Sequence, residues 1–135
     1  MKTFILSCLW FLLCIFITLK CAHAGDHELV ACVVGEASNQ GSFGMYALAS
    51  GLLNRIDLMG YDKALKGVYG CHARHVKDEP AWVWEEARLA LANAKVKRLH
   101  SGSYWENIKA FGRPGWVKDM RLVYQYRDHW FYKNK

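Results

Sequence analysis

Two apolar stripes at helical spacing, separated by a short turn with glycine, occupy residues 26–57 of this chain. The first stripe predicts a helix over residues 26–37, in which Leu29, Cys32 and Val33 recur on one face. Glu36 continues that face near the helix end. A carboxylate on an apolar face is costly to bury unless it has a partner or lines a cleft. The pattern therefore predicts a helical core with one unusual acid at its edge.

The later parts of the chain predict further helices and a small sheet. We expect helices over residues 42–57, 62–66 and 80–96, with Pro80 at the first position of the last one. Residues 121–133 are rich in β-branched and aromatic side chains and predict two short strands around a turn at Arg127-Asp128. The expected fold class is α+β, mainly α, with a small C-terminal antiparallel β element.

The first residues have the features of a signal peptide. Lys2 precedes an apolar run over residues 4–19, and Ala22-His23-Ala24 provides a small-x-small cleavage site. We expect cleavage after Ala24, which divides the chain into a signal peptide, 1–24, and one domain, 25–135, and places the protein outside the cell or in a periplasm. An uncleaved membrane anchor is the alternative.

The charge of the mature chain limits its partners. Removing Lys2 and Lys20 with the signal lowers the formal net charge from +6 to +4. A mildly basic exported protein suits an anionic surface such as a bacterial wall. The sequence has no basic run and no nucleic-acid motif, so we expect no nucleic-acid partner. We also expect no stable membrane insertion after the signal is cleaved, and a monomer.

Only Cys32 and Cys71 remain in the chain after the expected cleavage. Two cysteines in an oxidising compartment allow one disulfide, which would close a loop of roughly 40 residues. The alternative is that Cys32 is a small buried hydrophobe. The run Cys71-His72-x-x-His75 also has the spacing of metal ligands, but no fourth ligand is evident, and we expect no metal and no cofactor.

Glu36 is the best candidate for a catalytic residue. A carboxyl group half in the apolar interior and half in a cleft keeps its proton near neutral pH and can deliver it to a leaving group. Glycosidic bond cleavage needs such a general acid. The alternative is a structural glutamate that caps the following turn.

The segment over residues 104–116 mixes aromatic, amide and charged side chains in a way that suits sugars. Sugar rings present apolar faces to aromatic platforms and hydroxyl edges to polar groups. We expect Phe111 and Trp116 to be ordinary core residues. The residues expected to line a cleft are Tyr104, Trp105, Glu106 and Asn107.

Around Glu36, an ordered set of motifs resembles the catalytic domain of the SleB-like cell wall hydrolases, the spore-cortex-lytic family. The set spans residues 29–132 and comprises Val33-x-Gly35-Glu36-Ala37, Gln40-Gly41, Gly44-Met45, Ala47, Ala49, Asn54-Arg55, Gly67-Val68-Tyr69, Pro114-x-Trp116 and His129-x-Phe131-Tyr132.

This resemblance implies a lysozyme-like fold and cleavage of the N-acetylmuramic acid–N-acetylglucosamine linkage of peptidoglycan. In the related lytic transglycosylases one glutamate acts first as acid and then as base, and the muramic C6 hydroxyl attacks to give a 1,6-anhydro product. The resemblance assigns that role to Glu36. Tyr104 and Glu106 would then orient the muramic group, and Trp105 and Asn107 would bind sugar.

Two segments depart from the family pattern, and both are expected to line the cleft. Residues 71–75 replace a Gln-Phe-Ser-like stretch, and residues 104–107 stand where relatives often carry a histidine motif. Two other functions remain open on the same fold. One is a hydrolytic muramidase in which Glu106 activates water, and the other is a catalytically inactive wall-binding protein.

Overall fold

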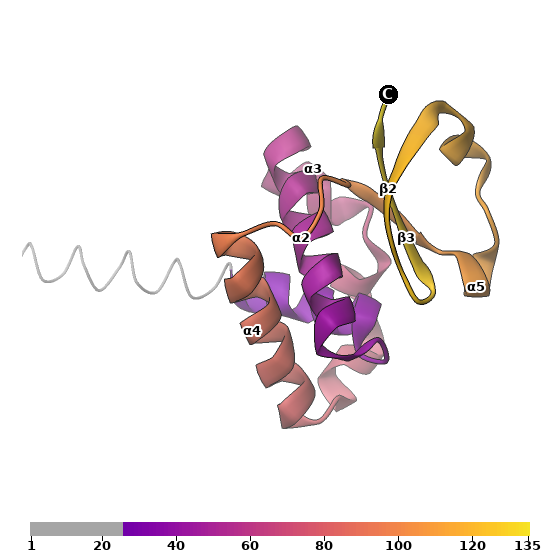
Figure 1. Cartoon of the computed structure of the whole chain (residues 1–135). Coiled ribbons are helices and arrows are strands. Elements are labelled where there is room, and N and C mark those ends of the chain that lie inside the picture. The colour runs from indigo at the N-terminus through magenta and orange to yellow at the C-terminus, as the bar shows by residue number, and fades with distance from the viewer. Residues whose placement is uncertain (1–25) are drawn as a thin grey trace, which may run out of the picture.

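A computed structural model describes residues 26–135, in which helices form one side of the molecule and a small sheet the other (Figure 1). The expected signal peptide, 1–24, lies outside the described residues. The helical elements are a helix over residues 26–37, α2 (Gly41–Met59), α3 (Tyr61–Lys66), η1 (Tyr69–His72), η2 (Arg74–Asp78), α4 (Ala81–Val96), α5 (Ile108–Phe111) and η3 (Gly115–Asp119). The strands are β1 (Tyr104–Asn107), β2 (Met120–Tyr126) and β3 (His129–Asn134).

The core lies between the helix over residues 26–37, α2 and α4, and α2 and α4 pack side by side (Figure 1). The stripe of the first helix is buried as expected, with Cys32 and Val33 fully inaccessible. Helix α4 begins one residue later than expected, at Ala81, because Pro80 has an extended backbone and is the N-cap of the helix. The buried face of α2 includes Met45, Leu48, Ala49, Leu52 and Leu53.

The sheet is antiparallel, with the strand order β1-β3-β2. The expected hairpin is confirmed as β2 and β3, and Arg127 in its turn has a φ of 48°. Strand β1 is a third member that the sequence did not predict. It pairs with β3 in a register that places Trp105 opposite Phe131. The α+β, mainly α, class is therefore confirmed, with one more strand than expected.

The connection between α4 and β1 is held by polar side chains of α2. The Asn54 side-chain amide donates to the carbonyl oxygens of His100 and Gly102 at 2.8 and 2.9 Å. Ser50 Oγ accepts from the Leu99 N–H at 2.9 Å. Buried polar groups need such partners, so these bonds fix the point at which β1 begins.

His100 completes this anchor. Its Nδ1 accepts from the Gly102 N–H at 3.0 Å, so Nε2 carries the proton and donates to the Ala47 carbonyl oxygen at 2.8 Å. Burial lowers the pKa of His100, although the bond to Ala47 raises it. The imidazole is thus held neutral between α2 and the start of β1.

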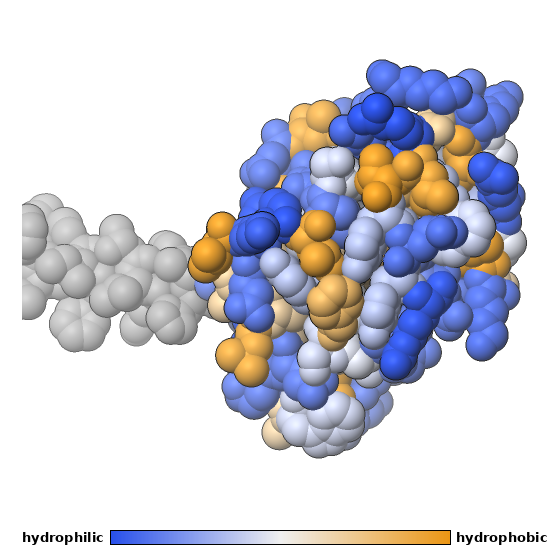
Figure 2. All heavy atoms as spheres, viewed as in Figure 1, coloured by the Kyte–Doolittle hydropathy of each residue, from blue (hydrophilic) through white to orange (hydrophobic). Residues whose placement is uncertain are grey.

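Figure 2 shows the surface in the same view, where hydrophobic side chains form small separate groups among hydrophilic ones. None of the helices within residues 26–135 combines the length and the hydropathy needed to cross a membrane.

Candidate active site

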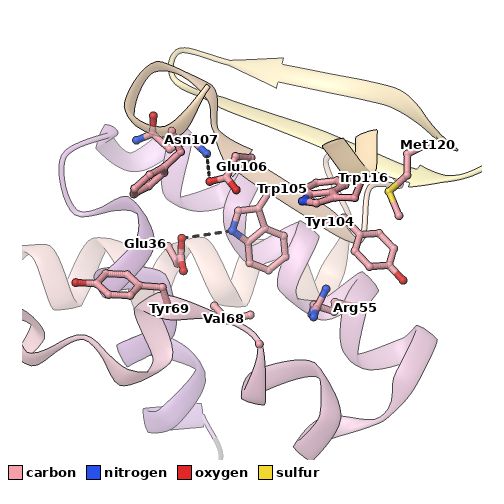
Figure 3. A pocket seen from close by; sticks show the side chains of 12 residues that line it. Glu36, Arg55, Val68, Tyr69, Tyr104, Trp105, Glu106, Asn107, Trp116 and Met120 are labelled. Atoms are coloured by element: carbon pink, nitrogen blue, oxygen red, sulfur yellow. Dashed lines mark hydrogen bonds between the residues drawn. The ribbon is translucent and has the colours of Figure 1, made fainter. Parts of the chain in front are cut away.

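A pocket of about 600 Å³ lies between the helices and the sheet, and Glu36 lines it (Figure 3). All four residues expected in a cleft, 104–107, line the same pocket. The structure therefore brings together the candidate acid and the candidate sugar-binding segment, although they are far apart in the sequence. The complete lining is Glu36, Arg55, Gly67, Val68, Tyr69, Tyr104, Trp105, Glu106, Asn107, Phe111, Trp116 and Met120.

Both carboxyl oxygens of Glu36 have a donor. The Gly70 N–H donates to Oε1 at 2.7 Å, and Trp105 Nε1–H points at Oε2 at 3.4 Å (Figure 3). Burial raises the pKa of Glu36 above its ordinary value, and the nearby charge of Glu106 raises it further, while the two N–H donors lower it. The net direction is upward, because the loss of solvent outweighs the two bonds.

The Gly70 donor reaches Glu36 because two glycines let the backbones touch. A Cβ on Gly35 would lie 2.1 Å from the Gly70 carbonyl oxygen. A Cβ on Gly70 would lie 2.4 Å from Glu36 Cγ. Neither position has room for a side chain, so the end of the first helix and the start of η1 meet at their closest possible approach.

A disulfide joins Cys32 and Cys71 beside this contact. Cys71 follows Gly70, and Cys32 lies one turn before Glu36 on the same helix. The bond therefore ties together the two segments that carry the acid and its backbone donor.

Trp105 approaches Glu36 from the sheet. Its ring packs over α2 at Gly51, where a Cβ would lie 3.3 Å from the indole ring. The same glycine faces Phe131 of β3 at 3.3 Å. A small residue at this point of α2 lets β1 and β3 sit close to the helix, and this places the indole N–H at the acid.

Glu106 and Asn107 both lie on β1 at the pocket, but each has a local partner. Glu106 Oε1 accepts from the Asn107 N–H at 3.0 Å (Figure 3). Asn107 Oδ1 accepts from the Ala110 N–H at 2.9 Å and so caps α5. Asn107 thus has a structural role, and its amide N–H groups remain for a ligand.

Two expectations about the residues around the pocket are wrong. Phe111 and Trp116 are not core residues, since they are 79% and 39% exposed and both line the pocket. Phe111 lies on α5 and Trp116 on η3, which are two short elements between β1 and β2. The expectation that residues 71–75 line the cleft is also wrong, because the neighbouring residues 67–69 do so instead.

Arg55 and Tyr69 also line the pocket, although sequence reasoning assigned them no role beyond their place in the family motifs. Arg55 lies on α2, and its guanidinium is 5.3 Å from the centre of the Tyr104 ring. Tyr69 is 73% exposed at the pocket edge. An aromatic residue this exposed is a signal of binding only once the structure is known.

Among residues 26–135, no three His, Cys, Asp or Glu side chains gather as a possible metal site. No family model, no curated protein and no solved structure matches the chain.

Proposed function

We propose that this chain is a secreted peptidoglycan-cleaving glycosidase with a lysozyme-like fold, a lytic transglycosylase that cuts N-acetylmuramic acid–N-acetylglucosamine linkages. The observation that carries the proposal is the environment of Glu36. A half-buried carboxyl group with a raised pKa lies in a pocket lined with aromatic side chains. The resemblance to the SleB-like hydrolases points to the same residue.

The bonds around Glu36 suit a group that gives up a proton and then takes one back. In the first step Glu36 protonates the glycosidic oxygen as the bond to the muramic C1 breaks. The resulting carboxylate is stabilised by the N–H groups of Gly70 and Trp105. The carboxylate then accepts the proton of the muramic C6 hydroxyl as that oxygen bonds to C1, so the proton count is restored without water.

The aromatic residues supply the binding surface. Figure 3 shows Trp105 beside Glu36, with Tyr69 on one side of the pocket and Tyr104 and Trp116 on the other. Flat side chains on both sides of the acid support a glycan strand that crosses the pocket with its scissile bond at Glu36, because sugar faces stack on aromatic rings.

The products of digestion test the reaction type. Purified sacculi are incubated with the protein, and the released muropeptides are analysed by mass spectrometry. The proposal predicts 1,6-anhydromuramic ends, which are lighter by one water than reducing ends. Reducing ends as the main product would contradict the transglycosylase assignment.

A hydrolytic muramidase is the second candidate, because Glu106 lines the same pocket and its charge acts on Glu36. A second carboxylate could activate water on the opposite side of the sugar. Glu106→Gln separates the two. A transglycosylase still forms anhydro ends in this variant, at a reduced rate because Glu106 orients the muramic group, whereas a muramidase loses its reducing-end products.

A further inference from the structure

A second hollow adjoins the pocket of Glu36 and is basic. It has a volume of about 560 Å³ and shares Arg55, Gly67 and Tyr104 with the first pocket. Its remaining charged residues are Lys63 and Lys66, which are exposed on α3. No Asp or Glu side chain is among its described lining residues, so three cations face one hollow without a counter-charge.

Arg55 stands at the junction of the two hollows and is held there by neutral groups. Its Nε donates to the Ala64 carbonyl oxygen at 3.0 Å, and its guanidinium faces the Tyr104 ring. A Cβ on Gly67 would lie 3.0 Å from Arg55 Nη2, so the guanidinium lies close over that backbone. Figure 3 shows Arg55 near Tyr104, on the side of the pocket away from Tyr69.

The environment of Arg55 favours an anionic ligand. Burial lowers the pKa of Arg55, and Tyr104 opposes this effect. Within residues 26–135 the ion pairs are Arg88–Glu85, Lys95–Asp26 and Arg98–Asp57, and Arg55 is in none of them. Half-buried charges in proteins are usually paired, and a fixed guanidinium presents N–H groups that match a carboxylate.

We propose that Arg55, Lys63 and Lys66 form a subsite for a carboxylate carried on the muramic residue of the substrate. This inference rests on the proposed function. The carboxylate has two possible sources, which are the lactyl group of a muramic residue without peptide and the peptide stem attached to it. The subsite would select strands by the charge of the group that the muramic residue carries.

The test measures the binding of three soluble probes to the Glu36→Gln protein, which cannot use Glu36 as an acid. The probes are the N-acetylglucosamine–N-acetylmuramic acid disaccharide with a free lactyl carboxylate, the same disaccharide with a peptide stem bearing free carboxylates, and that stem with all carboxylates converted to carboxamides. We expect one carboxylate probe to bind roughly tenfold more tightly than the carboxamide probe. The tighter of the two carboxylate probes identifies the source.

Charge removal then tests the residues. In the Glu36→Gln protein, Lys63→Gln with Lys66→Gln should reduce the preference to below about threefold, and Arg55→Gln should reduce it further. Lys77→Gln with Lys97→Gln removes the same charge at exposed positions outside both hollows and should keep the preference. Equal affinities for all three probes would overturn the subsite. A preference that survives both Arg55→Gln and the pair Lys63→Gln with Lys66→Gln would also overturn it.

The same probes distinguish failure of the subsite from failure of the proposed function. If the protein with Glu36 intact cleaves no glycan strand but binds carboxylates through these three residues, the glycosidase proposal is wrong and the subsite stands. If it cleaves strands and shows no carboxylate preference, the subsite is wrong and the glycosidase proposal stands.

Discussion

The two sides of the pocket hold their residues in different ways. On the helical side, Glu36 is fixed by backbone contact between Gly35 and Gly70 and by the disulfide next to it. On the sheet side, Phe111 and Trp116 extend from short elements, and Phe111 is 79% and Trp116 39% exposed. The comparison separates two roles, because the position of an acid must be exact to a fraction of an ångström, whereas a sugar platform must only present a flat face.

The largest expected effect on stability comes from removing the disulfide on the helical side of the pocket. Replacing both Cys32 and Cys71 with alanine should lower the free energy of unfolding by about 4 kcal/mol, because the disulfide closes a loop with a sequence separation of 39. Urea unfolding of the oxidised parent and the double variant measures this. A difference in unfolding free energy below about 1 kcal/mol would show that the disulfide does not stabilise the contact beside Glu36.

A steric change at the contact between Gly35 and Gly70 should lower the free energy of unfolding slightly less than loss of the disulfide does. Gly35→Ala places a methyl group 2.1 Å from the Gly70 carbonyl oxygen and should destabilise the fold by about 3 kcal/mol. Gly115→Ala is the matched control, since nothing lies within 4 Å of its Cβ, and its effect should stay below about 0.5 kcal/mol. Denaturant midpoints of the two variants compare them, and equal midpoints would refute the close approach.

The sheet side should respond in binding rather than in stability. Phe111→Ala should raise KM for glycan strands roughly fivefold, equivalent to about 1 kcal/mol, because an aromatic face is lost. The unfolding free energy should change by less than about 0.5 kcal/mol, since Phe111 is 79% exposed. Trp82→Ala removes an aromatic side chain that is 61% exposed outside the pocket, and KM should not respond. A large loss of stability in the Phe111 variant would place that residue in the core after all.

The smallest expected effect is on the pH dependence of stability. Burial raises the pKa of Glu36 in the folded state above the 4.5 of the free side chain. The folded state therefore holds this proton more tightly, so the contribution of Glu36 is most favourable below pH 4.5 and is lost as pH rises through the folded pKa.

Glu36→Gln has no proton to lose at this position, so it should gain stability relative to the parent across that window. Urea unfolding of both proteins from about pH 4 to about pH 8 measures the difference. Parallel curves would mean that Glu36 titrates as an exposed side chain does.

Features that depend on local periodicity were predictable from the sequence. The stripe that ends at Glu36 and the hairpin around Arg127-Asp128 were both read from residues close together in the chain. Strand β1 was not predictable, because all four of its residues are half-buried and show no alternation, and because its pairing with β3 joins distant segments.

The same distinction applies to the site. Glu36 was predictable because it is a carboxylate on the otherwise apolar face of its own helix. Arg55 was not, because its importance comes from Tyr104 and Gly67, which only the fold brings to it. Phe111 and Trp116 were assigned to the core because hydropathy does not indicate whether an aromatic residue is covered.

The most direct test of the central claim is the rate at which Glu36→Gln clears a suspension of purified sacculi. Glu86→Gln is the matched control, because it is also partly buried but lies on α4 outside the pocket. We predict that Glu36→Gln slows clearing by at least about a hundredfold and releases no anhydro ends, while Glu86→Gln clears at the rate of the parent. Clearing by Glu36→Gln at the parental rate would contradict the assignment of Glu36 as the acid.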